Sequence, residues 1–313
     1  MDEKEKVFFS NQGLEFKNII AEGGFGVIYL MYSEQYHSNF AMKKIPKERY
    51  NQEEYEIMAS IDHPNTINLY KTYQFDNKIY MLMEYCPNDL SNFLKGNPNL
   101  DSQQIKKYCY EVLIAIKACH DRNIAHSDIK PSNFLIDSYG RLKVCDFGLS
   151  RVYDGSLTND MYKGTLYFMA PELLKKRHYN PLKADIWTIG VTFFYIATRR
   201  YPFYSSNPEI LNNVIEAGVY SSFKVRNLEL RQIISRCLDV LPEKRPTVDE
   251  LLAHPYFSSL NARKLRKLVG NGNTMSAEII RPSVATSTKP KFERQSCILN
   301  PSIIRKAAIP KII

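Results

Sequence analysis

The sequence predicts an α+β protein in which strands come first along the chain and helices follow. Residues 19–30 alternate apolar and polar side chains around a glycine-rich turn, a pattern typical of two strands joined by a hairpin. Further along, a run of 13 mostly apolar residues extends from Ile186 to Thr198 and is bounded by charged residues. Because a membrane-spanning helix needs about 20 apolar residues, this run predicts a buried helix of a folded domain.

Composition narrows the class of protein further. The 313 residues are 44% hydrophobic and 24% charged, which excludes a wholly disordered or fibrous chain. This length suffices for one large two-lobed domain or for two modest domains, each with its own core. Residues 1–6 alternate in charge with no apolar segment after them, and the six cysteines show neither a C-x-x-C pair nor zinc-ligand spacing. We therefore expect an intracellular protein with free thiols and no membrane span, located in the cytoplasm, with the nucleus as an alternative.

The net charge of +9 is confined to one end of the chain. Of the 42 Lys and Arg and the 33 Asp and Glu, 11 and 2 lie in residues 258–313, which leaves 31 of each sign before them. This basic tail is poor in aromatic residues and predicts a mostly disordered segment after a domain boundary near Phe257. Residues 260–269 predict a short basic amphipathic helix, expected to be a solvated extension; the alternative is a contact with a membrane, with RNA or with a regulatory partner such as calmodulin. The tail lacks the aromatic or glycine-arginine interleaving of nucleic-acid binders, which argues against that class.

The hairpin and the strand after it predict a phosphate site. Glycines at 23, 24 and 26 allow backbone N–H groups to approach a polyphosphate closely. The next strand, residues 39–45, places Ala41 and Lys43 on one face and Lys44 on the other. A small residue beside an adenine ring and a lysine beside its phosphates would suit a nucleotide, whereas an edge strand with solvated lysines is the alternative.

A helix over residues 52–61 offers three glutamates as partners for Lys43. Only Glu54 shares a face with the apolar residues three, four and seven positions further on. Its carboxylate would point inward, where an unpaired charge is costly. The sequence therefore predicts an ion pair between Lys43 and Glu54.

Side chains that could take part in catalysis are most concentrated in residues 126–136 and 141–148. Phosphoryl transfer needs a base for the attacking hydroxyl, oxygen ligands for Mg²⁺ and cations near the developing charge. In these residues Asp128 could act as the base, Asn133 and Asp146 could bind the metal, and Lys130 could supply the cation. Cys145 precedes Asp146 directly and is expected to be a small buried apolar residue; the alternative is a thiolate favoured by the neighbouring lysine and metal, open to alkylation and protected by ATP.

These motifs, followed by Ala170-Pro171-Glu172, by Asp185 and by Arg245, resemble those of eukaryotic protein kinases over residues 16–257. Lys130, two residues after Asp128, and Thr165 resemble the serine/threonine type, and two stretches are most similar to the calcium/calmodulin-dependent group and its neighbours. The resemblance implies a bilobal kinase fold with a small β-rich lobe and a larger helical lobe. Its implied divisions are an N-terminal extension (1–13), a kinase domain (14–257) made of an N-lobe (14–83), a hinge (84–89) and a C-lobe (90–257), and the tail (258–313).

The same resemblance assigns roles to individual residues. Lys43 would hold the ATP phosphates and pair with Glu54, while Asp128 would act as base beside Lys130. Asn133 and Asp146 would hold Mg²⁺. The nucleotide would contact Ala21, Gly23, Gly24, Gly26, Ile28, Ala41, Met83 as gatekeeper, Glu84 and Cys86 through the hinge backbone, Asp89 at the ribose, and Leu135. Glu172 with Arg245, and Asp185, would brace the scaffold.

Four departures from the family pattern refine the expectation. Ala21 replaces the first loop glycine, and Ser127 replaces the arginine that grips phosphate on the activation segment. The connection from Lys43 to Glu54 is short, so the helix that carries Glu54 is expected to lack an N-terminal turn. Ser132 stands where arginine-directed kinases carry a glutamate. We expect an ATP- and Mg²⁺-dependent kinase of protein serine and threonine, with little dependence on activation-segment phosphorylation. The alternative is a pseudokinase scaffold that binds nucleotide weakly and recruits partners.

Overall fold

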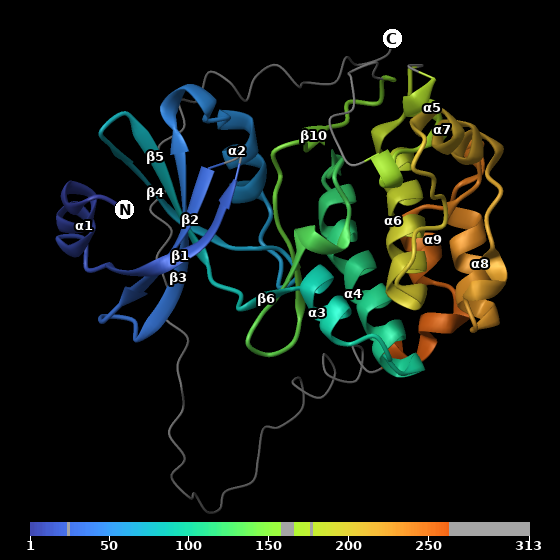
Figure 1. Ribbon diagram of the computed structural model, residues 1–313, viewed down its shortest axis with the longest axis horizontal. Helices are drawn as coiled ribbons and strands as arrows, with labels where there is room; N and C mark the ends of the chain where they lie inside the picture. The colour runs from blue at the N-terminus through green and yellow to red at the C-terminus, as the bar shows by residue number, and fades with distance from the viewer. Residues whose placement is uncertain (24–25, 158–165, 176–177, 263–313) are drawn as a thin grey trace, which may run out of the picture.

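The computed structural model describes residues 1–23, 26–157, 166–175 and 178–262, and it shows a β-rich lobe followed by a helical lobe (Figure 1). The first lobe contains a five-stranded antiparallel sheet in the order β1-β2-β3-β5-β4. Its elements are α1 (Glu3–Ser10), β1 (Glu15–Gly23), β2 (Gly26–Ser33), β3 (Ser38–Pro46), η1 (Lys47–Arg49), α2 (Gln52–Ser60), β4 (Leu69–Phe75) and β5 (Lys78–Glu84). The strands expected in residues 19–30 and 39–45 are confirmed.

The two faces of this sheet are covered by different helices. Alternate residues of β3, Phe40 and Met42, are buried on the outer face in a cluster that also contains Phe9 of α1. On the other face α2 packs toward the helical lobe, and Ile57 joins the large core of the molecule. The segment that the sequence predicted only as an extension thus begins with a helix that forms part of the lobe.

The second lobe is built mainly of helices, with short strands at the junction with the first lobe. Its elements are β6 (Asn88–Asp89), α3 (Leu90–Gly96), α4 (Ser102–His120), β7 (Ile124–Ala125), η2 (Pro131–Asn133), β8 (Phe134–Ile136), β9 (Leu142–Val144), β10 (Arg151–Val152), η3 (Leu166–Phe168), α5 (Pro171–Leu174), α6 (Pro181–Thr198), α7 (Pro208–Ala217), η4 (Ser222–Lys224), α8 (Leu228–Cys237), η5 (Pro242–Lys244), α9 (Val248–Leu252) and η6 (Pro255–Phe257). The α+β bilobal fold expected from the sequence is confirmed.

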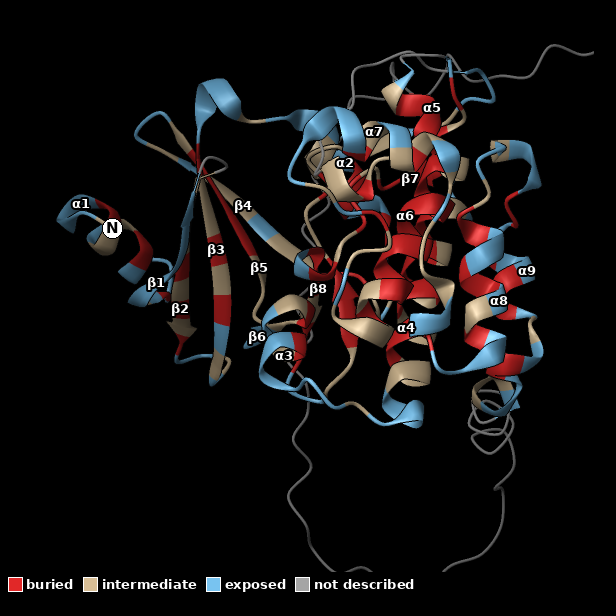
Figure 2. Cartoon of the chain, turned by 45° about the vertical axis from the view of Figure 1, so that its right-hand side comes forward, coloured by how far each residue is buried: buried red, intermediate tan, exposed pale blue. Residues whose placement is uncertain are grey.

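Helix α6 is the centre of this lobe and is buried along most of its length (Figure 2). It begins five residues before the predicted run because Asn180 caps it by accepting hydrogen bonds from the backbone N–H groups of Leu182 and Lys183. Gly190 lets α8 approach closely, since a Cβ at this position would lie 2.7 Å from that of Cys237. None of the described helices is long and apolar enough to cross a membrane.

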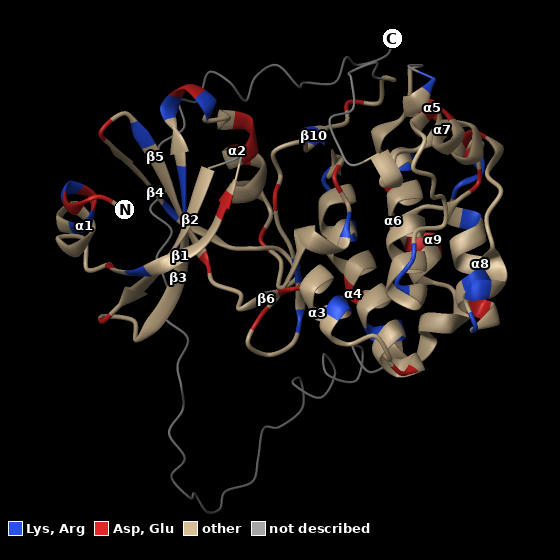
Figure 3. Cartoon of the chain, in the orientation of Figure 1, with Lys and Arg blue, Asp and Glu red and all other residues tan. Residues whose placement is uncertain are grey.

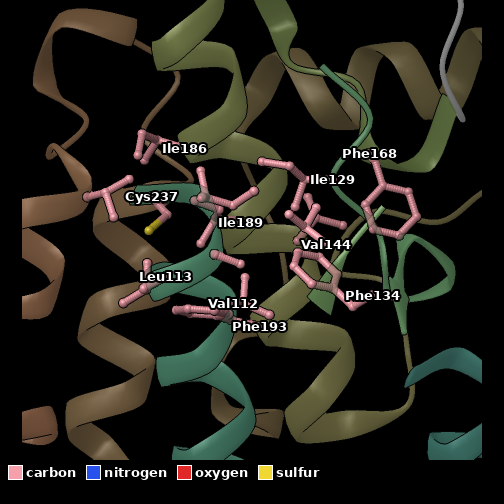
Figure 4. Packing of buried hydrophobic residues seen from close by; sticks show 14 of the residues in the cluster. Val112, Leu113, Ile129, Phe134, Val144, Phe168, Ile186, Ile189, Phe193 and Cys237 are labelled. Atoms are coloured by element: carbon pink, nitrogen blue, oxygen red, sulfur yellow. The ribbon is translucent and has the colours of Figure 1, made fainter. Parts of the chain in front are cut away.

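The core of the helical lobe supports the loops at the junction. Figure 4 shows Val112 of α4 and Phe193 of α6 packed together, with Phe134 of β8 and Val144 of β9 beside them. Because β8 and β9 rest on these helices, the segments that precede and follow them are held in fixed positions. Both signs of charge are spread over the two lobes (Figure 3), as expected from the equal numbers in residues 1–257. The predicted tail helix at 260–269 lies mostly outside the described residues.

Candidate active site

A cleft of about 610 Å³ lies where the two lobes meet. It is lined by most of the residues predicted to contact a nucleotide or metal, namely Ala21, Gly23, Gly26, Ile28, Ala41, Lys43, Glu54, Met83, Glu84, Cys86, Asp89, Asn133, Leu135 and Asp146. Gly24 lies outside the described residues. Gly26 has a φ of 118°, and a Cβ there would collide with the carbonyl oxygen of Lys44, so this turn requires glycine.

The structure brings Lys43 and Glu54 together inside the cleft. Lys43 Nζ lies 2.9 Å from Glu54 Oε1, and the two side chains are only 14% and 11% exposed. Glu54 lies in the first turn of α2, three residues after the capping residue Asn51, as the short connection predicted. Lys44 points to the opposite face and pairs with Glu5 of α1 instead. The period of two in β3 therefore separates the two lysines as expected.

Asp128, Lys130 and Asn133 form a compact hydrogen-bonded group in the loop between β7 and β8. Lys130 Nζ donates to Asp128 Oδ2 at 2.8 Å, and Asn133 Nδ2 donates to the same oxygen at 2.8 Å. Asn133 Nδ2 also donates to the backbone carbonyl of Asp128 at 2.8 Å. Asp128 is buried and remains an acceptor of hydrogen bonds through its second oxygen. The arrangement gives one carboxylate in a fixed orientation with a cation beside it.

The backbone of this loop is held by a buried aspartate of α6. Asp185 Oδ2 and Oδ1 accept hydrogen bonds from the N–H groups of His126 and Ser127 at 2.8 and 2.9 Å. The same carboxylate lies 3.0 Å from His120 Nε2 of α4. Ser127 has a φ of 63°, a conformation that costs free energy in a residue other than glycine. The loop is therefore held from outside in a conformation that an unsupported loop would not retain.

Asp146 approaches the ion pair of Lys43 and Glu54 at Gly148. A Cβ at Gly148 would lie 3.4 Å from Asp146 Oδ1 and 3.5 Å from Glu54 Oε2, so both carboxylates converge on this glycine. Asn133 Nδ2 donates hydrogen bonds to Asp128, so the Oδ1 atom of Asn133 is the one that could bind a cation. A carboxylate and an amide oxygen are the donor types that Mg²⁺ takes together with phosphate oxygens. The described residues contain no cluster of three His, Cys, Asp or Glu that would hold a metal without such phosphates.

The hinge is connected to the helical lobe by a buried ion pair. Lys143 Nζ of β9 lies 2.9 Å from Glu84 Oε2, and the backbone N–H of Glu84 donates to Asn68 O. Burial raises the pKa of the Cys86 thiol to about 12, so the Cys86 side chain in the hinge is neutral. Both carboxylate oxygens of Asp89 accept hydrogen bonds from Asn92 at the start of α3. A ribose contact by Asp89 would have to share these oxygens.

The surroundings of Cys145 favour the small apolar role over the thiolate. Cys145 lines the cleft, but burial and then the charge of Asp146 raise the pKa of its thiol, and these effects outweigh the influence of Lys43. Its Sγ donates to the carbonyl oxygen of Asn133 at 3.4 Å, and its own carbonyl oxygen lies 3.0 Å from His126 Nε2. Cys145 is therefore a partly buried residue of the cleft wall with a neutral thiol.

Ile67 and Asn92 are among the cleft residues that were not found from the sequence. Ile67 lies outside the regular strands, and its position depends on a hydrogen bond from its N–H to Val144 O, 77 residues away. Asn92 enters the cleft only because it lies in the first turn of α3, where its backbone N–H is capped by Asp89. Neither residue carries a local pattern that indicates a site.

The predicted scaffold pair of Glu172 and Arg245 is also brought together. Arg245 donates to both carboxylate oxygens of Glu172, at 2.6 and 2.8 Å, although the two residues are 73 positions apart. His126 and Phe147 lie against each other with ring centroids 5.2 Å apart. These contacts join the segment after Asp146 to the helical core.

Comparison with known proteins agrees with this geometry. The protein kinase domain family matches residues 14–257. Sperm motility kinase 2A of Mus musculus is 33% identical over 250 residues, covering 78% of this chain and 49% of that protein. The probable serine/threonine-protein kinase MARK-A of Dictyostelium discoideum is 32% identical over 249 residues, covering 77% of this chain and 24% of that protein.

CBL-interacting protein kinase 5 of Oryza sativa subsp. japonica is 32% identical over 272 residues, covering 82% of this chain and 58% of that protein. The chain thus spans less than two thirds of the length of these relatives. They fit the resemblance to the calcium/calmodulin-dependent group and its neighbours. The match over residues 14–257, together with the two-lobed fold around a shared cleft, shows that this chain belongs to the protein kinase domain family.

Proposed function

We propose that this chain transfers the γ-phosphate of ATP to serine or threonine hydroxyls of proteins, with Mg²⁺ as the metal. The observation that carries the proposal is the hydrogen-bonded group of Asp128, Lys130 and Asn133 at a cleft that also holds the ion pair of Lys43 and Glu54. A pseudokinase scaffold without catalytic activity would not need all five of these residues, because its fold depends on other pairs such as Glu172 with Arg245.

Each of these residues has a distinct task in the proposed reaction. Asp128 would accept the hydrogen bond and then the proton of the acceptor hydroxyl as its oxygen attacks phosphorus. Lys130, already 2.8 Å from that carboxylate, would offset the negative charge that develops on the transferred group. Lys43, oriented by Glu54, would hold the phosphates that remain with the nucleotide. Asp146 and Asn133 would hold Mg²⁺, which would offset the charge of the phosphates.

The proposal is tested by incubating the purified chain with γ-labelled ATP, Mg²⁺ and a mixed library of peptides that contain serine, threonine or tyrosine. We expect label on phosphoserine and phosphothreonine, and loss of transfer when EDTA removes the metal. Absence of transfer to every library and protein substrate, with nucleotide still bound, would instead support the scaffold alternative.

We expect activity without phosphorylation of the activation segment, residues 146–172. A phosphate orders such a segment by accepting charge-assisted hydrogen bonds from arginines, and the usual catalytic-loop arginine is Ser127 here. The described parts of the segment have other supports: Ser150 Oγ donates to His126 O at 3.0 Å, β10 pairs with β7, and Glu172 binds Arg245. Phosphatase-treated enzyme should therefore lose less than about tenfold in rate, equivalent to about 1.4 kcal/mol.

Mass spectrometry should confirm that the treated segment is unmodified before the assay, and enzyme incubated without phosphatase is the control. A larger loss in rate would show that phosphate orders the segment despite Ser127. Thr158, Tyr162 and Thr165 of this segment lie outside the described residues.

A further inference from the structure

A side-chain hydrogen bond joins the activation segment to the beginning of helix α6. Tyr153, the residue directly after β10, donates from its Oη to the carbonyl oxygen of Gly155 at 3.1 Å. The same oxygen of Tyr153 accepts a hydrogen bond from Asn180 Nδ2 at 3.3 Å, although the two residues are 27 positions apart. We call Tyr153 and Asn180 the Tyr153–Asn180 pair.

Asn180 is fixed in place by the helix that it caps. Its Oδ1 accepts hydrogen bonds from the backbone N–H groups of Leu182 and Lys183 at 2.9 and 3.3 Å. Pro181 occupies the first position of the helix, where its fixed φ favours the helical conformation. One amide group therefore binds α6 through its oxygen and the activation segment through its nitrogen.

The backbone of Tyr153 is held by the strand that leads into the catalytic loop. Its N–H donates to Asn123 O at 2.7 Å, which extends the pairing of β10 with β7 by one residue. Strand β7 is followed directly by His126, whose N–H donates to Asp185 of α6. Asp185 and Asn180 belong to the same end of α6. The contacts thus close on themselves, from α6 through the catalytic loop, β7 and β10 back to α6.

This closed arrangement restrains the activation segment without a phosphate. Displacing Tyr153 from α6 would break its bond with Asn180 and disturb the pairing of β10 with β7 at the same time, and hydrogen bonds in such a network support one another. The usual arginine that would bind a phosphate is Ser127 in this chain. The Tyr153–Asn180 pair needs no modification, because a hydroxyl and an amide are uncharged donors and acceptors at every physiological pH.

We infer that Tyr153 and Asn180 are positioning residues, which hold the beginning of the activation segment where phosphoryl transfer requires it. This inference rests on the proposed function and adds to it the contact that replaces a phosphate. Neither residue is among those that line the nucleotide cleft. Their loss should therefore slow transfer to a peptide without changing the affinity for ATP.

The test uses two conservative variants of the full chain, both treated with phosphatase. Tyr153→Phe removes the hydroxyl and keeps the ring, and Asn180→Ser removes the amide nitrogen but keeps a good N-cap for α6. Each should lower kcat with a Ser/Thr peptide about fivefold to tenfold, the effect expected from losing one or two hydrogen bonds, with KM for ATP unchanged. Hydrogen exchange at the backbone N–H of Tyr153 should become faster in both variants.

The double variant shows whether the two residues act together. Because each single substitution breaks the same hydrogen bond, the double variant should be within about twofold of Tyr153→Phe in kcat. Losses that multiply in the double variant would overturn the inference, since the two residues would then act separately.

Two matched controls share the local structure of the pair. Asn207 caps α7 through its Oδ1 and is followed by a proline, as Asn180 is at α6, so Asn207→Ser tests the cap alone. Tyr139 is 69% exposed in the turn between β8 and β9, so Tyr139→Phe tests the loss of a tyrosine hydroxyl. Both controls should keep kcat within about twofold of the wild-type value.

A purely structural role for the pair would give a different result. Tyr153→Phe and Asn180→Ser would then lower the midpoint of thermal unfolding and leave kcat within about twofold of wild type, which would overturn the inference. Wild-type enzyme would still phosphorylate serine or threonine in that case, so the proposed function would stand. Absence of transfer by the wild-type enzyme itself would refute both.

Discussion

Replacement of Asp146 by Asn is expected to lower the rate of phosphoryl transfer by at least about 1000-fold, equivalent to about 4 kcal/mol of activation free energy. The substitution preserves the shape of the side chain but removes the negative charge that a hard cation requires. Asn133 would then be the single remaining protein ligand from the proposed pair. Since Asp146 lines the cleft and Asn keeps nearly the same side-chain shape, the midpoint of thermal unfolding should change little.

The measurement is kcat with a Ser/Thr peptide at saturating ATP over a range of Mg²⁺ concentrations, together with nucleotide affinity by calorimetry. Asp154→Asn is the matched control, because Asp154 is an exposed aspartate of the same segment whose carboxylate accepts hydrogen bonds from Ser156. It should retain the wild-type rate. Equal phosphotransfer by wild type and Asp146→Asn would refute the role of Asp146 and the proposed reaction with it.

The arrangement at the cleft could be predicted largely from the sequence because its chemistry is concentrated in short segments. Asp128, Lys130 and Asn133 lie within six residues, so the loop that carries them brings them together. The pairing of Lys43 with Glu54 followed from two periodicities, that of a strand and that of a helix, applied to neighbouring elements. Their roles in catalysis remain predictions.

The features that the sequence did not predict depend on contacts between distant residues. The stacked rings of Tyr167, Tyr195, Tyr201 and Tyr204, for example, come from positions that share no single periodicity. Helix α1 was missed for the same reason. Its eight residues are half charged, and nothing local shows that Glu5 would be fully buried by Lys44, Lys78 and Tyr80.

Replacement of Glu5 by Ala is expected to lower the free energy of unfolding by about 3–5 kcal/mol, the usual cost of removing one partner from a buried ion pair. Glu5 Oε1 accepts hydrogen bonds from Tyr80 Oη at 2.6 Å and from Lys78 Nζ at 3.1 Å, and it lies 2.6 Å from Lys44 Nζ. Without this carboxylate, the ammonium groups of Lys44 and Lys78 and the phenol of Tyr80 would lose the acceptor that they share. The loss should be measured by urea denaturation at pH 7.

Glu3→Ala is the matched control on the same helix. The side chain of Glu3 is 84% exposed and pairs with Lys6 on the surface, so its removal should cost less than about 1 kcal/mol. Both residues lie in the first turn of α1, so a general effect of the substitution on helix propensity would appear in both variants. Equal destabilisation by the two substitutions would contradict the role assigned to the buried carboxylate.

The contribution of Glu5 should also depend on pH in a defined direction. Burial alone would raise the pKa of Glu5, but the hydrogen bonds from Lys44, Tyr80 and Lys78 outweigh it and lower the pKa from 4.5 to about 2. Because the folded-state pKa lies below the unfolded one, the stabilisation is fully present above pH 4.5 and is lost as the pH falls toward 2. The difference in unfolding free energy between wild type and Glu5→Gln should therefore be constant from pH 5 to 7 and decrease below pH 4.5. A difference that stays the same down to the lowest pH at which both proteins fold would show that Glu5 is not held as a carboxylate by these three donors.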